Sequence, residues 1–103
     1  MSKTSASDLK RFRAEADCTL RHAKATAGAL VQILEAGGGV HVDCSAVEQA
    51  DITFVQALVA TERSCAARDL PFALTGLSDV VASAFQRAGV TPPGSMPSEL
   101  SGI

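Results

Sequence analysis

The segment from Gly38 to Leu77 constrains the fold most, because it has the pattern of a strand, a helix and a second strand. A short β-branched run, Val40 to Val42, lies between three glycines and polar turn residues, which is typical of a buried strand. The stretch from Asp51 to Arg68 lacks Gly and Pro and has core-type residues at helical spacing: Phe54, Leu58, Thr61 and Cys65. After Leu70-Pro71, the run Phe72 to Leu74 predicts the next strand. Such short connections imply parallel strands with a right-handed crossover.

The outer face of the predicted helix 51–68 contains aliphatic side chains where polar, solvated residues are expected. At about 100° per residue, the side opposite Phe54 and Leu58 holds Ile52 and Val59, together with Gln56, Arg63 and Ala67. Scattered aliphatic residues are common on protein surfaces and require no function. The alternative interpretation is a partner-binding patch at the N-terminal end of the helix.

The flanking segments predict three further elements. Charged and apolar residues alternate from Phe12 to Leu20, which indicates a strand at the edge of the sheet with one face in water. An apolar stripe predicts a helix over Ala23–Ala36, with Gly37 in the left-handed cap conformation. A third helix is expected over Ser78–Ala88, starting at a Ser N-cap and stopping at Gly89. The predicted core comprises Leu30, Ile33, Leu34, Val40, Val42, Phe54, Leu58, Phe72, Leu74, Val81 and Phe85.

The composition indicates one compact domain, since the 103 residues are 47% hydrophobic and 19% charged. We expect this domain to span 1–90, with a frayed start over 1–8 and a loose tail over 91–103. A net charge of −2, with no Trp or Tyr, argues against nucleic-acid binding. No membrane-spanning run and no signal peptide are evident, so we expect a cytoplasmic protein without membrane insertion. The sequence does not indicate the oligomeric state.

Several polar groups could suggest chemistry, but each has a simpler interpretation. His22 and His41, with Asp43 or Cys44, lack the local half-site of a zinc centre, so no metal is expected. Cys44 and His41 lie three residues apart at a strand end, so their side chains should point to opposite faces rather than form a nucleophile and base. Asp43 and Asp51 could form an acid/base pair, but each also suits a turn or a helix cap.

The glycines and cysteines likewise indicate no cofactor. The run Gly37-Gly38-Gly39 precedes a strand rather than a helix, and no Gly-Lys-Ser/Thr follows it, which argues against a phosphate loop. The three cysteines are widely separated, without a Cys-x-x-Cys pair, and are expected to be reduced and packed as small hydrophobes: Cys18, Cys44 and Cys65.

Three motifs, in this order and spacing, resemble the STAS domain. They are Val40-His41-Val42-Asp43-Cys44-Ser45, Asp51-Ile52-Thr53-Phe54 and Leu74-Thr75-Gly76-Leu77-Ser78, within a resemblance that covers about Ala14 to Val90. STAS domains form anti-sigma factor antagonists, tails of anion transporters, and small chemotaxis and lipid-transport regulators. The resemblance implies an α/β, STAS-like fold, with a small mixed β-sheet of about three or four strands flanked by about three α-helices. The family's first strand is expected to be shortened or missing.

One position departs from the family's pattern. The regulatory phosphoserine of the family directly follows the Asp at the helix start, where this chain has Ile52. Thr53 is the hydroxyl left in the motif and is therefore the candidate phosphorylation site, although a first-turn hydroxyl is also a common cap. The resemblance implies binding to a regulatory kinase, of the anti-sigma or chemotaxis histidine kinase class, without the usual phosphoserine switch. The expected partner-binding residues are Asp51, Ile52, Thr53, Gln56, Val59 and Arg63.

Other functions stay open on the sequence alone. Within the binding class, the chain could instead be a chemotaxis-pathway regulator or a subunit of a phospholipid-transport assembly. The alternative of another class is a small thiol or hydrolytic enzyme. That alternative lacks an assembled nucleophile, base and orienting group, so we expect no enzymatic activity.

Overall fold

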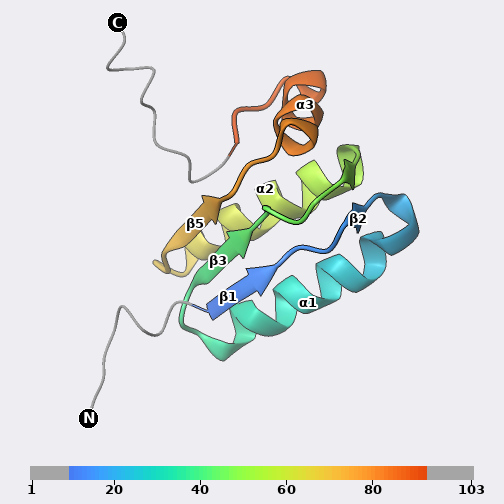
Figure 1. Ribbon diagram of the computed structural model, residues 1–103. Helices are drawn as coiled ribbons and strands as arrows, with labels where there is room; N and C mark the ends of the chain where they lie inside the picture. Colours follow the sequence, from blue (N-terminus) through green and yellow to red (C-terminus); the bar gives the residue numbers. More distant parts are fainter. Residues whose placement is uncertain (1–9, 93–103) are drawn as a thin grey trace, which may run out of the picture.

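A computed structural model describes residues 10–92 and shows an α/β fold built on a three-stranded parallel sheet (Figure 1). The sheet has the order β1 (Lys10–Arg13), β3 (Val40–Asp43), β5 (Phe72–Thr75). Its register aligns Phe12 with Val42, and Val42 with Leu74, so these side chains share one face. A smaller parallel pair joins β2 (Asp17–Cys18) to β4 (Gln49–Ala50).

Three α-helices complete the fold within residues 10–92, and the ends of α1 and α3 follow the expected glycine caps. Helix α1 spans Ala23–Ala36, α2 spans Ile52–Ala67 and α3 spans Asp79–Ala88. Gly37 and Gly89 take the left-handed conformation at φ 91° and 72°, which ends α1 and α3. Helices α1 and α2 lie side by side against the sheet, and α3 packs on α2 and β4 beyond the carboxyl end of β5 (Figure 1).

The buried residues confirm the predictions of which face of each helix points into the core. Among the predicted core residues, only Ile33 and Phe72 are not fully buried, and both still pack partly buried against the core. The core also includes residues that the sequence did not single out as buried: Ala14, Val47 and Val55. Gly76, at φ 67°, is needed where β5 leaves the sheet, because a Cβ there would lie 2.9 Å from the Ser45 nitrogen.

The segment Phe12–Leu20 was predicted as one strand, and this prediction is wrong. The edge position is correct for β1, but the chain leaves the main sheet after Arg13, and Leu20 belongs to a short 3-10 helix, η2 (Leu20–His22). The interruption has a tertiary cause: the Ala16 carbonyl accepts hydrogen bonds from the backbone of Glu48 and Gln49, which starts the separate β2–β4 pair.

The expected mixed sheet is also corrected, since every strand pair among residues 10–92 is parallel. The predicted α/β class itself is confirmed. The frayed start over 1–8, the family's first strand and most of the loose tail over 91–103 lie outside the described residues.

Candidate functional site

The start of helix α2 is held by the carboxylate of Asp51. Its Oδ1 accepts hydrogen bonds from the backbone N–H of Thr53, at 3.0 Å, and from the Thr53 hydroxyl. Its Oδ2 accepts a hydrogen bond from the backbone N–H of Leu20 at 2.8 Å, so the same side chain links η2 to the start of α2. The Thr53 hydroxyl, followed by these backbone donors, lowers the pKa of Asp51. Asp51 is therefore a helix cap and a link between two elements.

Four of the predicted partner-binding residues gather in one groove on the outer side of α2. Ile52, Gln56, Val59 and Arg63 line this α2–α3 groove, whose volume is about 380 Å³. Ile52 is 51% exposed, while Gln56 and Arg63 are also exposed. The groove is completed by residues that the sequence did not place at the site: Val55, Ala60, Ala88 and Val90.

Val59 differs from the expectation that it would be exposed together with Ile52, Gln56 and Arg63. It is partly buried and packs against the core. The cause is α3, because the end of that helix covers the same side of α2 and supplies Ala88 to the groove. Asp51 and Thr53 do not line the groove; they form the cap beside it.

Leu20 adds an apolar side chain next to this site. It is 71% exposed, more than any other large hydrophobic residue in the described chain. Its backbone is bonded to Asp51, the residue before Ile52, which brings Leu20 near the start of α2. Sequence reasoning missed Leu20 because it was assigned to the alternating strand. Its position beside the start of α2 depends on the tertiary hydrogen bond to Asp51.

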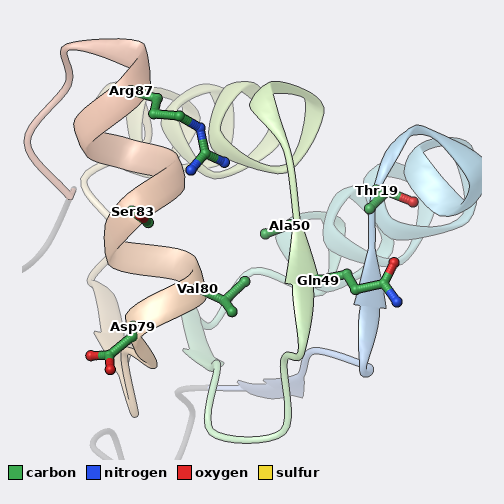
Figure 2. Close-up of a pocket in the computed structure, with 7 residues that line it drawn as sticks. All are labelled: Thr19, Gln49, Ala50, Asp79, Val80, Ser83 and Arg87. Carbon is green, nitrogen blue, oxygen red and sulfur yellow. The ribbon is translucent and has the colours of Figure 1, made fainter.

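A second groove, of about 520 Å³, lies between α3 and the β2–β4 pair. In Figure 2, Asp79 and Arg87 lie at opposite ends of the α3 face, while Val80 and Ala50 face each other across the groove. Ala50 directly precedes Asp51, the N-cap of α2, so this second groove reaches the start of α2 as well. The remaining lining side chains are small or neutral polar groups: Thr19, Gln49 and Ser83.

The carboxylate of Asp43 also has a structural role. Its Oδ2 pairs with the Arg11 guanidinium at 2.6 Å, and its Oδ1 accepts the backbone N–H of Ser45 at 3.0 Å. The Arg11 hydrogen bond is the main reason that the pKa of Asp43 lies well below its ordinary value. Asp43 and Asp51 are both held ionised by fixed donors, which does not suit proton transfer near neutral pH.

The cysteines lack the environment of reactive thiols. All three are buried, and burial raises the pKa of Cys18 to about 11 and that of Cys44 to about 12. Such thiols are protonated at neutral pH, whereas the thiolate is the nucleophile. His41 bonds through Nε2 to the Thr75 hydroxyl at 2.8 Å rather than serving Cys44. Within residues 10–92, no three metal-binding side chains form a cluster.

Comparisons with known proteins agree with this architecture. A family model described as "Mlab, STAS domain" matches residues 3–94. A solved sulfate transporter family protein from Wolinella succinogenes is similar in fold, with a TM-score of 0.65 and 24% identity over 84% of this chain and 71% of that one. No curated protein matches the chain. Over the described residues, none of the helices has the length and apolar character to cross a bilayer.

Proposed function

This chain belongs to the STAS domain family, and from that membership we propose that it is a non-enzymatic regulatory module that binds a partner protein through α2. The observation that supports this proposal is the α2–α3 groove, where Ile52 is half exposed beside aliphatic side chains and a single cation, Arg63. Exposed aliphatic surface of this kind is typical of interaction sites. Leu20 extends the proposed surface around Asp51.

The chemistry of the groove defines what a partner must offer. Aliphatic walls favour a partner segment with Leu, Ile, Val or Met side chains, because their burial supplies most of the binding free energy. Arg63 favours a carboxylate at one end of that segment. We assign the partner to the regulatory kinases of the anti-sigma or chemotaxis histidine class, with Asp51 and Thr53 shaping the start of the binding face.

A second candidate function is favoured because Ile52, which occupies the family's serine position, cannot be phosphorylated. A STAS module without a switch would serve as a permanent subunit, for example of a phospholipid-transport assembly. The Thr53 hydroxyl does not replace the missing serine, because it is engaged by the Asp51 carboxylate. The two candidates share the docking face and differ in the partner.

The test is a pair of substitutions at matched aliphatic residues. Ile52→Asp should weaken binding to a purified candidate kinase or transport subunit at least tenfold, about 1.4 kcal/mol, when measured by calorimetry. Val31→Asp on α1 is the control, since Val31 is 49% exposed and Ile52 is 51% exposed. If both variants bind with the same affinity as the parent protein, the binding surface does not include the start of α2. Binding to the transport subunit alone would select the second candidate.

A further inference from the structure

The α2–α3 groove combines an aliphatic lining with one positive charge. Its apolar walls come from both helices and from the second residue after α3: Ile52, Val55, Val59, Ala60, Ala88 and Val90. Arg63 is its one charged lining residue. Ile52 and Val90 leave 51% and 37% of their surfaces in water. An extended segment with a few aliphatic side chains and one carboxylate would match this surface.

The sequence immediately beyond the groove supplies such a segment. Val90 lines the groove, and the chain continues from there to residues 93–103, Pro-Gly-Ser-Met-Pro-Ser-Glu-Leu-Ser-Gly-Ile. This segment has three large apolar residues, Met96, Leu100 and Ile103, and one charged residue, Glu99, opposite in sign to Arg63. We propose that residues 93–103 bind along the α2–α3 groove of their own chain, with Glu99 near Arg63.

The segment is long enough for this path. Along α2, the groove runs from Ile52 to Arg63, about 16 Å at the rise of an α-helix. Residues 93–103 can span about 36 Å when extended. Pro93 and Pro97 fix one backbone angle each, which reduces the entropy lost on binding. Because the segment is tethered beside the groove, even weak contacts benefit from an effective concentration in the millimolar range.

Docking in this manner would make the tail a competitor for the proposed interface. The tail would cover Ile52, Val59 and Arg63, the residues assigned above to partner binding. This consequence rests on the proposed function, whereas the docking itself does not. A partner would first have to displace the tail, so the affinity measured for the whole chain would be lower than that of the open groove.

Methyl NMR on the whole chain tests the docking without any partner. The expected result is nuclear Overhauser contacts between methyl groups of Met96 or Leu100 and those of Val59 or Val90. In Met96→Asp/Leu100→Asp these contacts should disappear, and the Val59 and Val90 methyl resonances should shift. The matched control, Ser95→Asp/Ser101→Asp, adds the same two charges at hydroxyl positions and should preserve the contacts. Unchanged resonances of Leu30 and Leu58 confirm that the core is intact in both variants.

Charge exchange tests the orientation of the segment. Arg63→Glu should reduce the ratio of docked to undocked tail roughly threefold, as expected for an exposed ion pair. Combining it with Glu99→Arg should restore that ratio. Absence of the methyl contacts would overturn the proposal and leave partner binding by α2 unaffected. Contacts that vanish on tenfold dilution would also overturn it, because they would place the tail of a second copy in the groove.

Discussion

At the scale of single residues, Thr53 cannot simply take over the function of the missing serine. Its hydroxyl is bonded to Asp51, and it lies about 100° around the helix from Ile52. A phosphoryl group there would remove the hydroxyl donor from Asp51 and add nearly two negative charges beside that carboxylate. The N-terminus of a helix favours an anion by up to about 1 kcal/mol, which opposes this repulsion only in part.

We therefore predict that Thr53 is not phosphorylated to stoichiometry. Incubation with the candidate kinase and ATP, followed by peptide mass spectrometry, should yield unmodified Thr53. Ile52→Ser is the informative companion, since it restores a hydroxyl at the family's position and should gain phosphate if the kinase docks as proposed. Stoichiometric phosphate on Thr53 that disappears in Thr53→Val, together with regulation of binding, would contradict the prediction.

At the scale of elements, the helices could be predicted from sequence because their signals are local. The stripe Phe54, Leu58, Thr61 and Cys65 is buried along its whole length, which confirms the phase of α2. The strand at Phe12–Leu20 could not be predicted correctly, because its break depends on two hydrogen bonds, from the distant residues Glu48 and Gln49 to the Ala16 carbonyl. Short-range alternation contains no information about that pairing.

The partial burial of Val59 leads to a prediction about α2. Val59→Asp should lower the free energy of unfolding by about 1–3 kcal/mol, because a charge would be forced against the core. Ile52→Asp, one residue past the N-cap and half exposed, should change it by less than about 0.5 kcal/mol. Urea denaturation of both variants compares them directly. Equal stabilities would show that Val59 is as open to water as Ile52.

At the scale of the whole molecule, the candidate site depends on contacts between distant segments. Sequence spacing could group Ile52, Gln56, Val59 and Arg63, since they lie on one helix face. It could not add Leu20, which reaches the site through the Asp51 carboxylate, or Val90, which follows α3. Val90 is brought in by the packing of α3 on α2, and Leu20 by its hydrogen bond to Asp51, so only the folded chain defines the complete surface.

The buried thiols make the stability of the whole domain sensitive to alkali. Their pKa values lie above the ordinary value of 9.0, reaching about 11 for Cys18 and about 12 for Cys44 because burial disfavours the thiolate. Below about pH 7.5 the thiols are protonated in both states, and this contribution to stability is fully present. As pH rises further, the unfolded chain loses these protons first. Unfolding therefore becomes more favourable until the folded thiols also ionise.

The expected slope is about 1.4 kcal/mol per pH unit for each thiol once its unfolded form is ionised. The chain has no tyrosine, so no phenol ionises in the same range. Urea denaturation between pH 8 and 10.5, with reductant present, should show the decline in the free energy of unfolding. Cys44→Ser has a hydroxyl that does not titrate, so its stability should decline less steeply with pH even if it is lower at pH 7. Identical slopes for the variant and the parent protein would mean that the folded state does not hold Cys44 protonated.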